Sequence, residues 1–137
     1  MTRTLCVEGD ITAVDTATNL VTQGSVTTPS RQVPTGVTRI KTIMGSFATD
    51  AAAAGENIIF VRLTGSAILG GAQTIMVGAT ANIAVQSGAD GSESGNTLFL
   101  YDGCDIAVRA GDTIDVQAEM AGVDNGTISI AVGLVFA

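Results

Sequence analysis

The segment Thr113-Ile-Asp-Val-Gln-Ala-Glu-Met120 alternates strictly between polar and apolar residues. One side of an extended chain would carry the apolar set Ile114, Val116, Ala118 and Met120. The other side would carry the polar set Thr113, Asp115, Gln117 and Glu119. A period of two residues is typical of a strand with one face in a core and the other toward water. The pattern therefore predicts a β-strand over residues 113–120.

The same period continues on the C-terminal side, after a turn predicted at Asp124-Asn125-Gly126. A closing strand over residues 128–136 would share its apolar face among Ile128, Ile130, Val132, Leu134 and Phe136. Its second face holds Ala131, Gly133 and Val135. Because these side chains are small, we expect another strand, layer or subunit to approach this face closely.

Two more strands are predicted on the N-terminal side, over residues 97–101 and 104–109. In the first, Leu98 and Leu100 point one way, and Thr97, Phe99 and Tyr101 point the other. Asp102-Gly103 lies between the two segments, and an Asp-Gly pair suits a hairpin turn in which both positions need a positive φ. The sequence therefore predicts a hairpin at residues 102–103, and a second turn at Ala110-Gly111-Asp112.

The middle of the chain adds predicted strands at 37–47, 58–64, 73–77 and 81–87, with loops at 50–55 and 87–96. Residues 37–47 are apolar on both faces, which indicates burial on both sides or a bulge near Gly45 that exchanges the faces. About eight antiparallel strands at this spacing predict an all-β, single-domain, jelly-roll-like β-sandwich or barrel. A barrel containing a meander is the second possibility, because tight turns join neighbours within one sheet.

Residues 1–36 are predicted to be an extended N-terminal arm, and residues 37–137 the β-domain. Short strands can form at 5–7 and 20–23, but Pro29 and Pro34 favour extended backbone and interrupt regular pairing. Such an arm can lie across a neighbouring subunit. An ordinary loop with an edge strand explains the same residues equally well.

The composition is 46% hydrophobic and 14% charged, so polar residues are too few to cover a small domain. We therefore expect a homo-oligomer. The net charge of −7 makes nucleic acid and anionic membranes unsuitable partners, because acidic side chains cannot neutralise the negative charges of either. No apolar run is long enough to span a bilayer, and the first residues do not form a signal peptide.

No catalytic, cofactor-binding or metal-binding residues are predicted, and the protein is not expected to be an enzyme. The chain has no histidine, which removes a Ser-His-Asp arrangement and the commonest metal ligand. Turns and polar strand faces account for the carboxylates Asp102, Asp105, Asp112 and Asp115, although a weak cation site there stays open. The loop Asp90–Asn96 follows a calcium loop in part, but Tyr101 stands where a bidentate glutamate is needed.

The two cysteines are too few for a disulfide framework. Cys104 is in phase with Ile106 and Val108, which favours a buried free thiol. A bridge between Cys6 and Cys104 would require the N-terminal segment to pack beside that strand.

The segments Ile106-Ala-Val-Arg-Ala-Gly-Asp-Thr-Ile-Asp-Val116 and Gly126-Thr-Ile-Ser-Ile-Ala-Val-Gly-Leu-Val-Phe136 resemble the end of a compact jelly roll. A Gly-Asp turn before the penultimate strand is similar to tumour necrosis factor-like trimeric heads. Size and strand rhythm are also similar to small viral jelly-roll proteins, both head-decoration (cement) and capsid proteins. The resemblance covers the last third of the chain.

This resemblance implies a virion structural protein, first of all a decoration protein that forms a trimer and stabilises the shell. Its partners would be other capsid proteins, with residues 1–36 as a clasp, and it would lie on the capsid surface after synthesis in the host cytoplasm. A jelly-roll major or minor capsid protein is the alternative within this class. An oligomeric glycan- or ligand-binding β-module is the alternative from another class.

Overall fold

The computed structural model describes residues 3–22, 30–49, 57–79, 95–122 and 127–137, and these residues form strands, turns and extended segments without a helix. No helix in these ranges could therefore cross a membrane. The strands are β1 (Arg3–Ile11), β2 (Thr18–Asn19), β3 (Val21–Thr22), β4 (Ser30–Gln32), β5 (Arg39–Thr49), β6 (Asn57–Thr64), β7 (Gln73–Ala79), β8 (Gly95–Ala107), β9 (Thr113–Gly122) and β10 (Ile128–Phe136). The predicted all-β class is confirmed.

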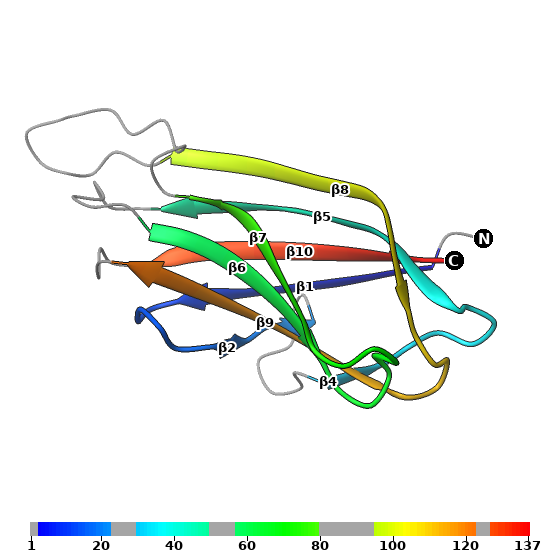
Figure 1. Ribbon diagram of the computed structural model, residues 1–137. Coiled ribbons are helices and arrows are strands. Elements are labelled where there is room, and N and C mark those ends of the chain that lie inside the picture. Colours follow the sequence, from blue (N-terminus) through cyan, green and yellow to red (C-terminus); the bar gives the residue numbers. More distant parts are fainter. Residues whose placement is uncertain (1–2, 23–29, 50–56, 80–94, 123–126) are drawn as a thin grey trace, which may run out of the picture.

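The strands form two sheets that face each other (Figure 1). Sheet A has the order β3-β1-β10-β5-β8, and sheet B has the order β2-β9-β6-β7, with β4 also paired to β9. The strand pairs within these orders are all antiparallel. From β7 through β8 and β9 to β10 the chain changes sheet at every step. This alternation is the jelly-roll arrangement, so the jelly-roll sandwich is confirmed over the meander-containing barrel.

The predicted hairpin at Asp102-Gly103 is wrong, because β8 continues through these two residues and the chain does not reverse there. Asp102 is opposite Thr42 of β5 and Ile106 is opposite Ile40, so β8 takes four steps where β5 takes two. The extra residues form a bulge, with φ of 74° at Gly103 and 51° at Asp105. An Asp-Gly pair accommodates positive φ in a bulge as well as in a turn, and pairing with β5 resumes beyond it.

The predicted N-terminal arm, residues 1–36, is corrected by the pairing of β1. This strand lies between β3 and β10, and it pairs with β10 from Arg3 opposite Phe136 to Ile11 opposite Ile128. Val7, Ile11, Leu20 and Val33 are all buried in the same core as the later strands. Arg3, Glu8 and Asp10 interrupt the apolar pattern of β1, which is why the sequence indicated an arm there. The described residues therefore make one domain without a boundary at residue 36.

The core lies between the sheets, and its largest contacts are aromatic. The rings of Phe47 and Phe99 have centroids 6.5 Å apart. Phe47 of sheet A reaches sheet B at Gly78, where an added Cβ would be 2.7 Å from the ring. Phe99 covers Gly45 in the same way, with its Cζ 2.6 Å from a Cβ built there. Two glycines thus provide the space that the two rings fill.

The face exchange predicted near Gly45 occurs closer to the start of β5. Gly45 is paired regularly with Val132 and Phe99. The pairing of β5 with its two neighbours, β10 and β8, instead shifts register at Lys41, between Ile40 and Thr42. Ile40 and Ile43 are both fully buried although they are three residues apart, which an unbroken period of two would not allow.

Other predictions fall wholly or mostly outside the described residues. These are the strand at 81–87, the loops at 50–55 and 87–96, and the turn at 124–126. The closing strand is confirmed, since Ile128, Ile130, Val132, Leu134 and Phe136 are all buried.

Candidate interaction surface

The outer face of sheet A carries side chains in rows that cross four strands. The strand register places Cys6 of β1, Gly133 of β10, Met44 of β5 and Leu100 of β8 side by side. We call this set the middle row. The next row consists of Glu8, Ala131, Ser46 and Leu98. Only one of these eight residues is charged, and Glu8 lies at the end of its row farthest from β8.

The apolar side chains of these rows are unusually exposed. Leu98 is 79% exposed, Leu100 is 67% exposed and Met44 is 38% exposed. Covering one such side chain is worth roughly 1.5–3 kcal/mol. An apolar area of this kind on a folded domain marks an interaction surface.

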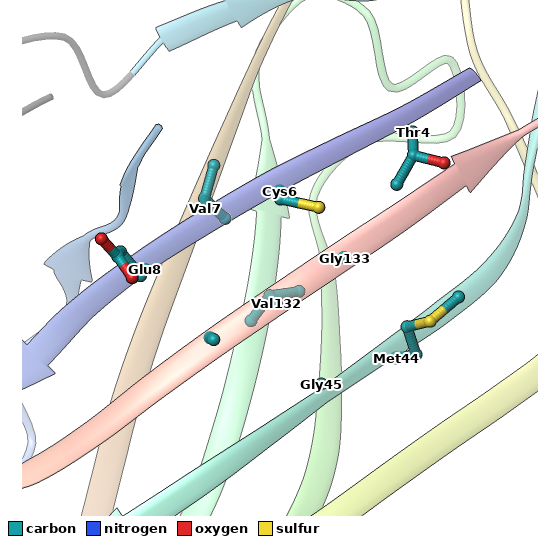
Figure 2. A pocket seen from close by; sticks show the side chains of 9 residues that line it. Thr4, Cys6, Val7, Glu8, Met44, Gly45, Val132 and Gly133 are labelled. Carbon is teal, nitrogen blue, oxygen red and sulfur yellow. The ribbon is translucent and has the colours of Figure 1, made fainter. Parts of the chain in front are cut away.

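A shallow groove of about 230 Å³ lies along the middle row (Figure 2). Cys6 and Thr4 stand on its β1 side and Met44 on its β5 side, with Gly133 between them (Figure 2). A Cβ at Gly133 would be 3.4 Å from Met44 Cγ and 4.0 Å from Cys6 Sγ. The groove therefore exists because residue 133 has no side chain. A second depression, at Met44, Ser46, Leu98 and Leu100, continues it to the β8 edge.

Polar contacts border the apolar rows at both ends of the strands. Near the end of β1, Ser129 Oγ donates a hydrogen bond of 2.9 Å to Asp10. At the opposite end, Thr42 Oγ1 donates one of 2.7 Å to Asp102. An apolar centre with a polar border is the usual anatomy of a protein interface.

The outer face of sheet B is different, because charged residues cross it. Its register places Glu119 beside Phe60 and Met76, and Gln117 beside Arg62 and Thr74. Met76 and Ile58 are exposed there too, and Ile58 lies between Ala79 and Ala121, but the next two rows contain Glu119 and Arg62. We therefore assign the candidate surface to sheet A.

The four aspartates singled out from the sequence are separated by the fold. Asp105 forms an ion pair of 3.3 Å with Arg39, and Asp112 forms one of 3.4 Å with Arg109. Asp102 is bound by Thr42, while Asp115 lies on β9 in the other sheet. Within the described ranges, no three His, Cys, Asp or Glu side chains gather where a metal ion could bind. Most of the Asp90–Asn96 loop lies outside those ranges.

Tyr101, the only tyrosine, closes the space between the two sheets at their open side. Its hydroxyl donates a hydrogen bond to the carbonyl of Met76 in β7. The ring thus joins β8 to β7 and has a structural role at this edge.

Both cysteines are free thiols. Cys6 is on β1 and Cys104 on β8, and the strands β10 and β5 lie between them. The bridge left open by the sequence is therefore excluded by the strand order. Cys104 is half-buried, and its Sγ is 3.5 Å from the carbonyl of Ile40.

The two thiols should react at different rates. Burial raises the pKa of the Cys104 thiol, so less of it is thiolate at a given pH, and thiolate is the reactive form. At pH 8 we expect a disulfide reagent to modify exposed Cys6 at least about tenfold faster than Cys104. The rate at Cys104 should still be rising above pH 9, since its pKa is higher than usual. Cys6→Ser and Cys104→Ser assign the two phases, and equal rates at the two thiols would contradict this account.

The sequence indicated part of this surface and missed the rest. It marked Ala131, Gly133 and Val135 as a face for close approach, and Ala131 and Gly133 do lie in the two rows. It did not mark Leu98 and Leu100 as exposed, because alternation alone does not say which face is inward. Phe99 was the residue that could have indicated the orientation. It is larger than Leu98 and Leu100, lies on the opposite face of the strand, and points into the core.

No family model and no curated protein matches the sequence. Among solved structures, the chain is similar to one from the acidic stable capsid structure of Helicobacter pylori bacteriophage KHP30. That similarity has 12% identity and a TM-score of 0.44, and covers 100% of this chain and 94% of that one. It is also similar to a chain of Desmodium yellow mottle tymovirus, with 6% identity, a TM-score of 0.24, and coverage of 98% and 88%. Both are viral structures, the class that the sequence resemblance named, while the jelly-roll assignment itself comes from the strand order.

Proposed function

We propose that this chain is a virion structural protein of the decoration (cement) type, which self-associates, as a trimer by the sequence resemblance, and stabilises a shell. The observation that carries the proposal is the pair of nearly uncharged rows on sheet A, which expose Leu98, Leu100 and Met44 on a jelly-roll domain. Jelly rolls serve in viral capsids, lectins and cupins, so the fold alone does not choose among these roles.

The chemistry of the surface favours a protein partner over a small substrate. The middle row offers an apolar, shallow groove whose lining includes one charged side chain, Glu8, and no histidine. Protein interfaces bury such areas, whereas a substrate site needs a few convergent polar groups. The aspartates that could do acid–base work are engaged with Arg39, Arg109 and Thr42. The proposal is therefore a non-enzymatic role with other shell proteins as partners.

The acidic balance supports the outer side of a shell rather than the side that faces a genome. With a net charge of −7, the chain would be repelled by nucleic acid phosphates. The net charge thus supports a position at the capsid surface as part of the proposal. It also makes a decoration role preferable to a major capsid protein, which is the alternative within the same fold.

The test is binding to shells of the virus whose genome encodes the chain. We expect the wild-type protein to cosediment with shells and to raise their disruption temperature. Gly133→Asp puts a carboxylate into the groove where a Cβ fits without a clash, and should weaken binding at least about tenfold, as loss of an interface centre does. Gly70→Asp is the matched control, since only Gln73 is near its Cβ, and should bind like the wild type.

Other outcomes would redirect the proposal. Closed shells formed by the purified chain alone, seen by electron microscopy, would identify a major capsid protein. Absence of shell binding together with saturable binding on a glycan array would favour the ligand-binding module instead.

A further inference from the structure

The edges of the two sheets differ in how well they are protected. β2, β3 and β4 have only two or three residues each, and β3 pairs with β1 at Val7 and Glu8 alone. The parts of the β1 edge that β3 leaves unpaired, residues 3–6 and 9–11, are short and contain the charged residues Arg3 and Asp10, which protect an edge. β7 is longer, but its partner β6 shifts register between Ile59 and Phe60, and the Tyr101 hydroxyl occupies the carbonyl of Met76. The remaining edge strand is β8.

The first half of β8 is long, regular and free of blocking features. From Gly95 to Asp102 it pairs residue for residue with β5, from Thr49 to Thr42, without a shift. Residues 97–101 contain no charge and no proline. Beyond the bulge, another segment covers the free edge of the strand. The Leu69 amide donates a hydrogen bond to the Ala107 carbonyl, and Ile68 forms a β-bridge with Val108. In the described part of the chain, residues 95–102 pair with β5 alone.

An edge of this kind is a template for pairing with another strand, and proteins normally cover or blunt it. We propose that a second copy of this chain covers it, with β8 pairing antiparallel to β8 of the other copy about a two-fold axis at Phe99. This register sets Leu98 of one copy opposite Leu100 of the other, and the reverse. The two five-stranded sheets then continue as one sheet across the axis.

Two features of the strand favour a second copy over an unrelated segment. The register places the exposed leucines of both copies next to each other on the outer face, near Met44, so apolar side chains of the same strand pack side by side across the axis. It also sets Asp102 opposite uncharged Asn96, so no like charges meet across the pair. Each β8 edge binds one other copy, so the contact is compatible with a trimer made through another surface.

The inference rests on the self-association part of the proposed function and can fail without it. In a first test, Leu98→Cys and Leu100→Cys are made separately in a Cys6→Ser background and oxidised alone and as an equal mixture. Directly opposite residues have Cα atoms roughly 4.5–5.5 Å apart, within disulfide reach, whereas diagonal neighbours are roughly 7–8 Å apart. We expect covalent dimer mainly in the mixture. Equal yields in all three samples, or none in any, would overturn the register.

In a second test, Leu98→Lys and Leu100→Lys are combined and the mass in solution is followed over a range of concentrations. Both side chains point outward, so the fold should be kept, as circular dichroism checks. The two-fold contact should weaken at least about a hundredfold, since two apolar anchors are replaced by charges. Met76→Lys, which changes an exposed apolar residue of β7, is the control and should leave the mass unchanged.

The outcomes separate this contact from the shell role. A wild-type chain that stays monomeric, or an oligomer that the double lysine variant does not change, overturns the β8 contact. If such a chain still binds shells through Gly133, the shell-binding part of the proposed function stands, and a monomeric wild type removes only its self-association part. If a monomeric wild type loses shell binding on Leu98→Lys and Leu100→Lys, the edge takes a strand of the shell and not a second copy.

Discussion

A chain without residues 1–33 is expected not to fold. The deletion removes the strands β1 to β4, together with the buried side chains of Val7, Ile11, Leu20 and Val33. It also uncovers one edge of β10, whose inward residues form the centre of the core. The loss should exceed the roughly 5–15 kcal/mol that a domain of this size has.

Circular dichroism and thermal melting check this expectation, with Thr4→Ala as the control. Thr4 is exposed on the outer face of β1, so its removal should change the free energy of unfolding by no more than about 0.5 kcal/mol. A truncated chain with a cooperative transition close to that of the full chain would restore the interpretation of residues 1–36 as an arm.

Gly45→Ala is expected to destabilise the protein by about 3 kcal/mol, toward the upper end of the cost of overpacking a core. The added Cβ would overlap the carbonyl oxygen of Ala131 in the neighbouring strand, and it would lie 2.6 Å from Phe99. Neither can yield easily, because one is backbone and the other is a ring 7% exposed. The melting temperature should fall by roughly 10 °C.

Gly78→Ala tests the same principle from the other sheet, where the new Cβ would meet the buried ring of Phe47 at 2.7 Å. Gly70→Ala is the control for both, because its Cβ has only Gln73 within reach, at 3.7 Å. It should melt like the wild type. Equal stability of Gly45→Ala and Gly70→Ala would contradict the close packing of Gly45 against Ala131 and Phe99.

The fold class and most strands follow from alternation in the sequence, because a half-buried strand imposes its period on the residues. Residues 113–120 and 128–136 show this most clearly, and β9 and β10 are found there. Which strand pairs with which is a different matter. Asp102-Gly103 has the same local preference in a turn and in a bulge, and only pairing with β5 decides between them. Local sequence could not supply that long-range information.

The candidate surface was predicted in part for a related reason. Small residues at 131 and 133 are visible in the sequence, but a row across a sheet is made by register between strands far apart in the chain. Cys6, Gly133, Met44 and Leu100 become neighbours only when β1, β10, β5 and β8 align. Leu98 and Leu100 point outward because Phe99, between them, points inward and packs over Gly45 of β5. Contacts that depend on the alignment of several distant strands cannot be predicted from any one segment of the sequence.

The pairing of β1 with β10 also governs how the chain reaches its folded state. Arg3 is opposite Phe136, so β1 begins and β10 ends at the same end of the sandwich (Figure 1). On the ribosome, β1 is made before the other strands described above and β10 after them, so this pair cannot form until all of those strands have been made. Closing so long a loop is costly in entropy, and all-β proteins dominated by such distant pairs fold slowly, in milliseconds to seconds. Until β10 is made, the edge of β1 that pairs with it has no partner strand, so the synthesis of β10 is the step that allows sheet A to close.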